Sequence, residues 1–382
     1  MTDTPKPDEP RIDWTEHGQP AQARWRSEAG LPPPRRVVVA DDTLRADEAW
    51  RLACGGTALL WRGDYQNARQ LLQAMGRRAD RSSGRGKPPA TLTDAFHRHR
   101  MAQAQRARTL GLLLVPVGEG GVVPLRRAPE VAEACRAAWG DIHGDSVVAL
   151  RELLGLIGAH QWRLNGVPVA ALGGRPIHPH YGVFAPVRGE YLDLIAEAPL
   201  PAGGLAFDVG CGTGVLAAIL ATRGVERVVA TDTSPRALAC ARDNLARLGL
   251  AAQVEVRDQD LFPEGRADLV VCNPPWLPGK PSSLLDQAIY DPDSRMLRGF
   301  LAGLPTHLAE GGEGWLVLSD LAERLGLRPR EALLGWIAAA GLRVLGRIDT
   351  RPRHGKAQDA SDPLHLARRD EVTSLWRLGV AA

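Results

Sequence analysis

The stretch FDVGCGTG at residues 207–214 decides the fold of the C-terminal half of this chain. It joins an apolar run of strand length, Leu205 to Val209, to an apolar run of helical length that starts near Thr213. Glycines at these positions let the backbone turn tightly and let a ligand approach where a Cβ would block it. The stretch therefore predicts a strand, a ligand-binding glycine loop and a helix.

The sequence that follows predicts a doubly wound α/β sheet. Apolar runs of strand length alternate with helical stretches, at 227–231, 253–257, 268–272 and 314–318. In open sheets of this kind, ligands lie beyond the carboxyl ends of the strands. Polar residues stand at or just past four such ends, namely Asp208, Asp232, Asp260 and Asn273. We expect these four side chains to lie along one edge of the sheet.

The turn Asn273-Pro274-Pro275-Trp276 follows the fourth of these strands. Together with the glycine loop, it makes the C-terminal half resemble a class I S-adenosylmethionine (SAM) methyltransferase. More narrowly, it resembles the small-domain branch, which has an Asn-Pro-Pro-aromatic turn and methylates planar nitrogens. The resemblance implies a Rossmann-like sheet of seven strands, SAM as the cofactor and no metal. A nicotinamide-binding Rossmann domain would need glycine at position 215, where this chain has Val215.

The resemblance also implies which residues hold SAM. The glycine loop offers N–H groups and room to the methionine and ribose parts, while Asp208 helps to hold the amino end, directly or through water. Asp232 accepts the two ribose hydroxyls, as carboxylates do well. Asp260 receives the adenine amine, and Leu261 or Phe262 packs on the ring. The residues predicted to bind the cofactor are Asp208, Gly210, Gly212, Gly214, Asp232, Asp260, Leu261 and Phe262.

An aromatic segment precedes the glycine loop, from Pro179 to Pro186. Nitrogen-directed methyltransferases have a similar entry segment over the SAM pocket. By that resemblance Tyr181, Phe184 and Glu190 line the pocket. The alternative is that the aromatic side chains close the core of the domain.

The predicted catalytic residues are those of the turn, Asn273, Pro274, Pro275 and Trp276. A planar nitrogen is a poor nucleophile because its lone pair is delocalised. The side-chain oxygen of Asn273 and the backbone oxygen of Pro274 can accept its two hydrogens and favour the pyramidal, positively charged transition state. The prolines stiffen the turn, and Trp276 offers a face on which a planar group can stack.

The N-terminal half predicts a smaller α/β domain. Strand-like and helical stretches alternate in it, at 36–41, 44–52, 57–61, 65–75, 112–116 and 130–139. This layout is similar to that of guanine-N2 ribosomal RNA methyltransferases, in which a degenerate methyltransferase copy precedes the active one. No glycine loop follows Asp41, so an unrelated accessory domain is the alternative. The predicted domains are a disordered lead-in at 1–30, an accessory or substrate-recognition domain at 31–140, a linker or helical connection at 141–178 and a catalytic domain at 179–382.

A basic run lies between Gly76 and Arg108, with nine Lys and Arg residues against two acids. Clustered positive charge is typical of a phosphate-binding surface and predicts RNA as a partner. A solvated linker and a charged helix face are the alternative. The residues predicted to contact nucleic acid are Arg77, Arg78, Arg81, Arg85, Arg98 and Arg100.

The bulk composition predicts a cytoplasmic enzyme. The longest apolar run that could be a membrane span, Leu110 to Val117, is only of strand length, whereas a membrane span needs roughly 20 residues. The polar segment from Met1 to Pro10 lacks the apolar core of a secretory signal. Five cysteines without metal-like spacing indicate reduced thiols.

The sequence alone does not determine which molecule accepts the methyl group. The tandem layout and the basic run favour an exocyclic amine of a ribosomal RNA base. The compact sequence Asn-Pro-Pro-Trp-Leu-Pro keeps a protein glutamine as the alternative, as in release-factor or ribosomal-protein methyltransferases. A non-catalytic SAM-binding RNA factor is disfavoured, because such a protein has no need of Asn273.

Overall fold

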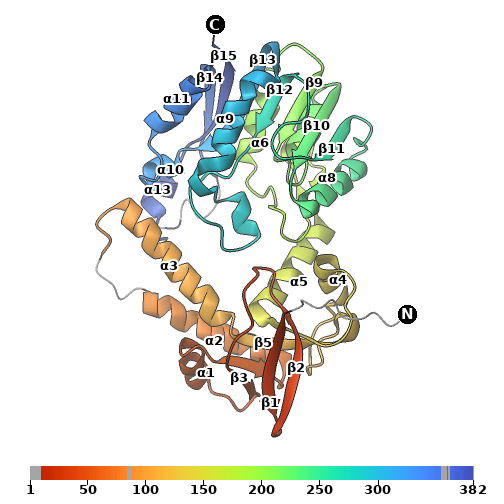
Figure 1. Cartoon of the computed structure of the whole chain (residues 1–382), viewed down its shortest axis with the longest axis vertical. Coiled ribbons are helices and arrows are strands. Elements are labelled where there is room, and N and C mark those ends of the chain that lie inside the picture. Colours follow the sequence, from red (N-terminus) through yellow and green to blue (C-terminus); the bar gives the residue numbers. More distant parts are fainter. Residues whose placement is uncertain (1–9, 84–87, 354–358, 360–361, 382) are drawn as a thin grey trace. The chain divides into compact units, whose positions relative to one another are not determined.

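The computed structural model describes residues 10–83, 88–353, 359 and 362–381 (Figure 1). The chain forms two compact units. Unit 1 comprises Met1–Pro88 and Arg98–Gln161, and unit 2 comprises Pro89–His97 and Trp162–Ala382. No helix among the described residues combines the length and the apolar character that crossing a membrane requires.

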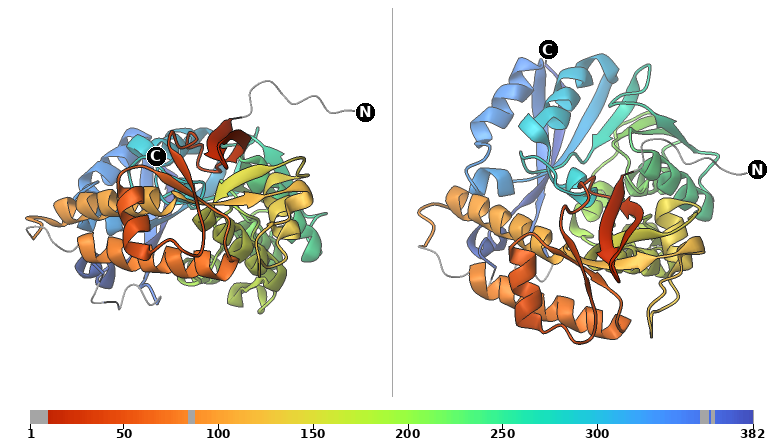
Figure 2. Two further views of the ribbon diagram at one scale, coloured as in Figure 1. Left: turned by 90° about the horizontal axis from the view of Figure 1, so that it is seen from below. Right: turned by 60° about the horizontal axis from the view of Figure 1, so that its bottom comes forward.

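Unit 1 is built on a six-stranded mixed sheet in the order β1-β2-β6-β5-β4-β3. Its strands are β1 (Arg11–Glu16), β2 (Gln19–Arg26), β3 (Val37–Ala40), β4 (Ala58–Trp61), β5 (Leu113–Val117) and β6 (Ser146–Ala149). Strands β3, β4 and β5 are parallel, β6 is antiparallel to β5, and β2 is parallel to β6. Its helices are α1 (Ala46–Cys54), α2 (Tyr65–Ser83), α4 (Ala132–Trp139), most of α3 (Leu92–Leu110) and most of α5 (Leu150–Asn165), with the short helix η1 (Glu119–Gly121). Helix α2 and the C-terminal half of α3 lie side by side (Figure 2), and an ion pair of 2.8 Å joins Arg106 to Asp80.

The prediction of a disordered lead-in at 1–30 is wrong for residues 11–26. These residues form a hairpin, β1 and β2, whose two-residue turn consists of His17 and Gly18, both with positive φ. Such a turn matches the twist of the two strands. Ile12 and Trp25 alternate with polar neighbours and are buried in the core of unit 1, so the hairpin is part of the sheet.

Two further expectations concern the N-terminal half. The predicted linker or helical connection at 141–178 contains the helix α5, and besides it β6, the short strands β7 (Val167–Pro168) and β8 (Pro176–Ile177), and the short helix η2 (Ala170–Leu172). A degenerate methyltransferase copy does not fit the strand order, because β3 is an edge strand whereas the first strand of the sheet in unit 2 is central. The N-terminal unit is therefore a separate α/β unit.

Unit 2 has the predicted seven-stranded sheet, in the order β11-β10-β9-β12-β13-β15-β14. Its strands are β9 (Leu205–Val209), β10 (Arg227–Asp232), β11 (Val254–Asp258), β12 (Ala267–Cys272), β13 (Leu308–Ser319), β14 (Leu342–Thr350) and β15 (Thr373–Val380). The first five are parallel, and β15 runs antiparallel to both of its neighbours. This arrangement confirms the predicted fold class.

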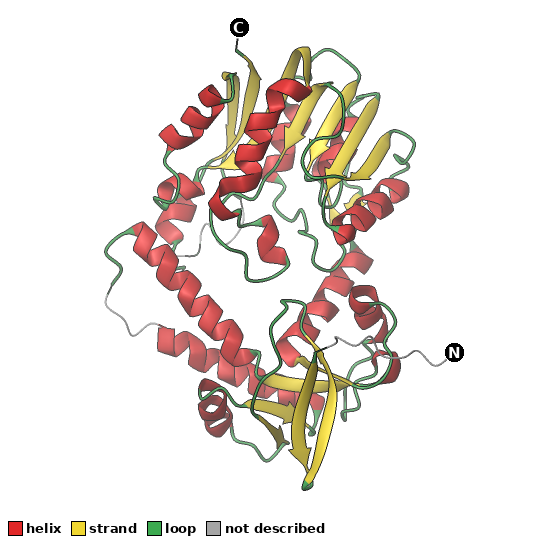
Figure 3. Ribbon diagram, in the orientation of Figure 1, coloured by secondary structure: helices red, strands yellow, loops and turns green. Residues whose placement is uncertain are grey.

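Helices cover both faces of this sheet (Figure 3). One face packs on α6 (Glu190–Glu197), α7 (Val215–Thr222) and α8 (Pro235–Arg247), and the other on α9 (Arg295–His307) and α11 (Arg330–Ala339). Successive residues of a strand point to opposite faces. Accordingly Ala206 belongs to the first core and Phe207 to the second. The other helices that the described part of unit 2 contains are α10 (Leu321–Arg324), α13 (His365–Arg369), η3 (Leu285–Ala288) and η4 (Pro292–Ser294).

Candidate active site at the ends of the central strands of unit 2

The glycine loop leaves β9 and turns into α7. Gly210, Gly212 and Gly214 all have positive φ, at 76°, 54° and 77°, which L side chains rarely adopt. The N–H groups of Gly210 and Cys211 donate to the carbonyl of Thr231 at 2.9 and 2.8 Å, so the loop is tied to β10. A Cβ on Gly212 would meet no atom within 4 Å, so open space lies beside the loop.

Asp208 lies on β9 below the loop and is almost completely buried. Its Oδ2 accepts from the N–H of Ala217 at 3.0 Å, while its buried Oδ1 has no hydrogen-bond partner among the described residues. Burial raises the pKa of Asp208 to about 7, and the carboxylate of Asp232 adds to the shift. A buried carboxylate oxygen of this kind calls for a donor, such as an ammonium group.

Asp232 is the last residue of β10 and lies at the glycine loop. Its Oδ2 accepts from the N–H of Gly212 at 3.0 Å, and its Oδ1 accepts from the N–H of Ser234 at 2.9 Å. Each oxygen keeps a second lone pair. The carboxylate is therefore fixed in orientation and able to accept further hydrogen bonds.

The three residues predicted at the adenine lie in different surroundings. Asp260 is exposed and pairs with Arg295 at 2.7 Å. Leu261 has a positive φ of 59°, and its carbonyl accepts from the hydroxyl of Thr231 at 2.5 Å. The ring of Phe262 is in the core, stacked on Phe300 and His307. Of the two candidates for the ring contact, Phe262 is thus committed to packing against α9.

The Asn-Pro-Pro-Trp turn follows β12 directly, as predicted, and Asn273 is half-buried. Its Oδ1 accepts from the indole Nε1 of Trp276 at 2.8 Å. The half-buried Trp276 side chain packs against the cores on both faces of the sheet. The contact between Asn273 and Trp276 was not predicted from the sequence.

Arg328 holds the same turn from a distant part of the sequence. Its side chain is buried, and its Nη2 donates to the carbonyl of Trp276 at 3.2 Å. Its Nη1 donates to the hydroxyl of Ser294 at 3.4 Å. Burial lowers the pKa of Arg328, and the carboxylate of Asp291 opposes that shift.

The segment before α9 reaches the glycine loop. Buried Asp291 accepts from the N–H groups of Met296 and Leu297 at 3.1 Å and so satisfies the start of the helix. A Cβ on Gly210 would collide with the Cε of Met296, so the Met296 side chain lies against the loop.

The entry segment lies partly in the core of unit 2. The Arg236 guanidinium on α8 lies over the ring of Tyr181, with 5.4 Å between its Cζ and the ring centroid. Phe184 is exposed, and Glu190 is buried at the start of α6. Their predicted place at a cofactor pocket stays a prediction.

Part of the basic run is neutralised within unit 1. Arg78 pairs with Asp47 and Arg106 with Asp80, and the Nε of Arg81 donates to the carbonyl of Arg77 at 3.2 Å. Exposed residues of the run include Arg77, Arg81, Arg98 and Arg108, while Arg100 is half-buried on α3. Arg85 and Lys87 lie outside the described residues.

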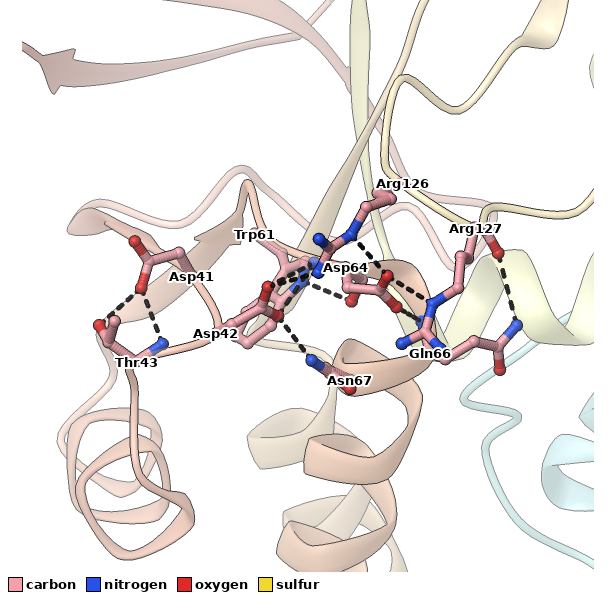
Figure 4. Close-up of polar contacts among 9 residues, drawn as sticks. All are labelled: Asp41, Asp42, Thr43, Trp61, Asp64, Gln66, Asn67, Arg126 and Arg127. Carbon is pink, nitrogen blue, oxygen red and sulfur yellow. Dashed lines mark hydrogen bonds and ion pairs between the residues drawn. The ribbon is translucent and has the colours of Figure 1, made fainter.

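Unit 1 has its own polar cluster where β3 and β4 end (Figure 4). Buried Asp64 accepts from Arg126 at 3.0 Å, from Arg127 at 2.6 Å and from the N–H of Gln66 at 2.8 Å. The hydrogen-bonded Arg127 guanidinium holds the pKa of Asp64 well below its usual range. Both oxygens of this carboxylate are therefore occupied.

The other two acids of the cluster also serve the local chain. Asp41 accepts from the N–H and the hydroxyl of Thr43 at 2.9 and 2.6 Å. Asp42 accepts from the N–H of Asp64 and the amide of Asn67, both at 3.0 Å. A Cβ on Gly63 would collide with Asp42, so the loop closes tightly. These contacts indicate that the polar cluster stabilises the loops of unit 1.

Residues 191–325 match the family model described as the methyltransferase small domain. This part of unit 2 is a class I SAM-dependent methyltransferase domain. The assignment confirms the predicted family and SAM as its cofactor. The site fits SAM, because Asp208 offers a buried oxygen without a donor and the space beside Gly212 is open.

Curated relatives of this domain act on different acceptors. The release factor glutamine methyltransferase of Cereibacter sphaeroides is 34% identical over 184 residues, which are 44% of this chain and 63% of that protein. The ribosomal protein L11 methyltransferase of Pelotomaculum thermopropionicum is 49% identical over 73 residues, 19% of this chain and 24% of that protein. The ribosomal RNA small subunit methyltransferase C of Alcanivorax borkumensis is 35% identical over 116 residues, 30% of this chain and 32% of that protein. The chain thus spans less than two thirds of the length of each of these relatives.

A solved structure shows a weaker similarity. The ribosomal protein L11 methylase of Lactobacillus delbrueckii subsp. bulgaricus is 18% identical, with a TM-score of 0.38. The match covers 55% of this chain and 87% of that one. Nothing about the function of this chain follows from a similarity at this level.

Proposed function

We propose that this protein is a SAM-dependent N-methyltransferase that acts on a planar nitrogen. The observation that carries the proposal is the Asn-Pro-Pro-Trp turn at the end of β12, one strand from the glycine loop that follows β9. When bound, SAM supplies a methyl group activated by its sulfonium. The residues of this chain then have to orient the acceptor nitrogen.

The cofactor is held, in this proposal, by groups whose positions the fold fixes. Asp208 Oδ1 accepts from the ammonium group of SAM, and this replaces a missing hydrogen bond. Asp232 keeps two lone pairs for the ribose hydroxyls while Gly212 and Ser234 fix its carboxylate. Asp260 accepts from the adenine amine in this proposal, and its carboxylate also stays paired with Arg295. Of the two hydrophobic candidates, we retain Leu261 for the adenine ring.

The acceptor nitrogen is oriented by two oxygens of the turn. Asn273 Oδ1 uses one lone pair for Trp276 and has one left for an N–H of the acceptor. The backbone oxygen of Pro274 takes the other hydrogen. As the nitrogen becomes pyramidal and positive, both hydrogen bonds strengthen, which lowers the barrier to transfer.

We favour an exocyclic amine of a ribosomal RNA base as the acceptor. Exposed Arg77, Arg81 and Arg108 support RNA binding, since arginine pairs well with phosphate. The methyltransferase C relative acts on ribosomal RNA. A cytoplasmic location agrees with such a substrate and stays a prediction.

A glutamine side chain is the second candidate. It is favoured by the release factor relative, which matches over a longer stretch than the ribosomal RNA relative. A glutamine amide is also planar and would use the same two oxygens. The two acceptors therefore differ in the surface that recognises them rather than in the chemistry of the turn.

Deletion of the gene tests the proposal. Ribosomal RNA nucleosides and protein glutamines from the deletion strain are compared with the wild type by mass spectrometry. We expect one methyl-adenine or methyl-guanine to be missing. A missing methylglutamine with intact RNA replaces the first candidate by the second. A purified protein that does not bind SAM in isothermal titration would contradict the proposal altogether.

A further inference from the structure

A tryptophan that only stacked on the methyl acceptor would not require the hydrogen bond between Trp276 and Asn273. Its length of 2.8 Å is that of a normal N–H···O bond. Stacking needs only the face of an aromatic ring, which phenylalanine also offers. The indole N–H is therefore an additional feature that needs its own explanation.

The N–H decides which way the Asn273 carboxamide faces. An indole nitrogen is only a donor, whereas a carboxamide has an acceptor oxygen and a donor nitrogen. If the amide were flipped, its NH2 group would face the indole N–H, and two donors would oppose each other. The bond thus selects the orientation in which Oδ1 is held and keeps one lone pair.

That orientation is the one that the proposed reaction needs. A flipped Asn273 would point its NH2 group at the amine that receives the methyl group. Both groups would then be hydrogen-bond donors, and no bond could form between them. The rate of transfer then depends on the fraction of molecules with the amide correctly oriented. Preorganisation of this kind lowers the barrier because no reorientation is needed during reaction.

Trp276 is itself held by Arg328. The Nη2 of this buried arginine donates to the Trp276 carbonyl, and its Nη1 donates to Ser294, the last residue of η4. Arg328 therefore ties the turn to the segment that begins α9. Its charge is buried, so loss of the guanidinium would leave the Trp276 carbonyl without this donor.

We propose that Trp276 and Arg328 are positioning residues for methyl transfer: Trp276 fixes the orientation of the Asn273 amide, and Arg328 fixes Trp276. The inference rests on the proposed function and names two residues that act through Asn273. Trp276 contributes its N–H in this role, whether or not its ring also stacks on the acceptor.

The test compares Trp276→Phe with Trp336→Phe. The first variant keeps an aromatic ring and removes the N–H, and the second makes the same change on α11, outside the turn. Transfer is measured from tritiated SAM to an extract of ribosomes and release factors from a strain that lacks the gene. We expect Trp276→Phe to lower kcat about tenfold, with SAM affinity within twofold of the wild type, and Trp336→Phe to leave both unchanged.

Double-mutant cycles separate positioning from stacking. In an Asn273→Ala background, Trp276→Phe should lower kcat less than twofold further, because the amide that it orients is gone. An equal loss in both backgrounds would overturn the proposal, as would full activity of Trp276→Phe. Other buried tryptophans also donate from their indole N–H, so the Trp276 signal is first assigned in proton–nitrogen spectra by its absence from Trp276→Phe. This N–H should be protected from exchange in the wild type and lose that protection in Asn273→Ala.

Arg328→Lys and Arg328→Met test the second residue. Lysine keeps one donor and should retain more of kcat than methionine, while SAM affinity stays the same in both. If both variants unfold, the indole protection in Asn273→Ala still decides the proposal. Failure of SAM binding or of wild-type transfer would contradict the proposed function, whereas failure of these variants to differ would contradict only the positioning roles.

Discussion

Asp64 in unit 1 and Asp208 in unit 2 are both buried carboxylates near the carboxyl end of a parallel strand, yet their surroundings differ. Asp64 accepts from two arginines and a backbone N–H. Asp208 accepts from one backbone N–H and keeps a buried oxygen without a partner among the described residues. The pKa of Asp64 is accordingly lowered, and that of Asp208 is raised to about 7.

The difference shows how two similar sequence patterns diverge in use. Both halves of the chain place acids after strands, but in unit 1 Asp41, Asp42 and Asp64 serve to close its own loops. Unit 2 leaves hydrogen-bonding capacity unused beside an open glycine loop. Buried polar groups are nearly always satisfied, and the unpartnered Asp208 oxygen supports a ligand because it lies next to an open glycine loop. Variants of matched residues in the two units sharpen this comparison.

The largest effect is expected for Asn273→Ala. Loss of one preorganised transition-state partner should reduce kcat roughly 100-fold and leave SAM affinity within a few fold. Asn67→Ala in unit 1 is the matched control, because the Asn67 side chain donates to Asp42 within its own loop. Steady-state transfer and isothermal titration with SAM check both. An equal loss of turnover and SAM affinity would mean that Asn273 supports the cofactor site or the fold instead.

A smaller effect is expected for Asp232→Ala. SAM binding should weaken by about 1.5–3 kcal/mol, the usual size for hydrogen bonds to a charged group. Asp41→Ala is the control, since Asp41 and Asp232 each accept from the N–H two residues later. It should leave SAM affinity unchanged in isothermal titration. Similar losses in both variants would contradict a specific contact of Asp232 with SAM.

The pH dependence contrasts the two buried carboxylates. Because the pKa of Asp208 is raised from 3.8 to about 7, its contribution to the stability of the ligand-free protein is present below pH 3.8 and is lost as the pH rises through 7. The ammonium of SAM favours the ionised carboxylate. Below pH 7, SAM affinity should therefore increase by up to about tenfold for each unit by which the pH is raised. Asp208→Asn should flatten this dependence. An unchanged slope in that variant would assign the titration to another group.

Asp64 should behave in the opposite way. Its pKa is lowered, so its contribution to stability is present above pH 3.8 and is lost as the pH falls further. Asp64→Asn should lower the melting temperature at pH 7, whereas Asp208→Asn should not. Thermal unfolding at pH 7 measures both. Equal melting temperatures would contradict the contrast between a loop-forming and a ligand-binding carboxylate.

The smallest effect is expected at the basic run. If exposed Arg77, Arg81 and Arg108 bind phosphates, neutralising all three should flatten the salt dependence of RNA binding. The slope of log K against log salt concentration should become less negative by about 0.7–0.9 for each phosphate contact that is lost. Neutralising Arg78 and Arg106 should change it less, because both pair with acids. Binding of ribosomal RNA fragments at several salt concentrations distinguishes the two sets. An equal change would remove the support for RNA from this surface.

The sequence allowed most of unit 2 to be predicted, because its signals are local and mutually consistent. Strand β9 runs from Leu205 to Val209 as predicted, and Ser234 and Pro235 start α8 as their residue types suggest. The hairpin of β1 and β2 was missed, although the alternation around Ile12 and Trp25 could have indicated it.

Other features could not be predicted from local sequence. The core position of Phe262 depends on the rings of Phe300 and His307, which arrive on a later helix. The hold of Arg328 on Trp276 depends on packing between segments far apart in the chain. The bond between Trp276 and Asn273 depends on one side-chain rotamer, which a sequence motif does not specify.

The glycine loop has a consequence for a residue that lies outside it. A Cβ on Gly214 would lie 3.2 Å from the Cα and Cβ of Ala241 on α8. Space between the two residues is limited from both sides, so a larger residue at position 241 would press on the loop just as a side chain at position 214 would. Evolution of this domain is therefore expected to couple the two positions. Engineering of the cofactor loop has to treat Ala241 as part of it.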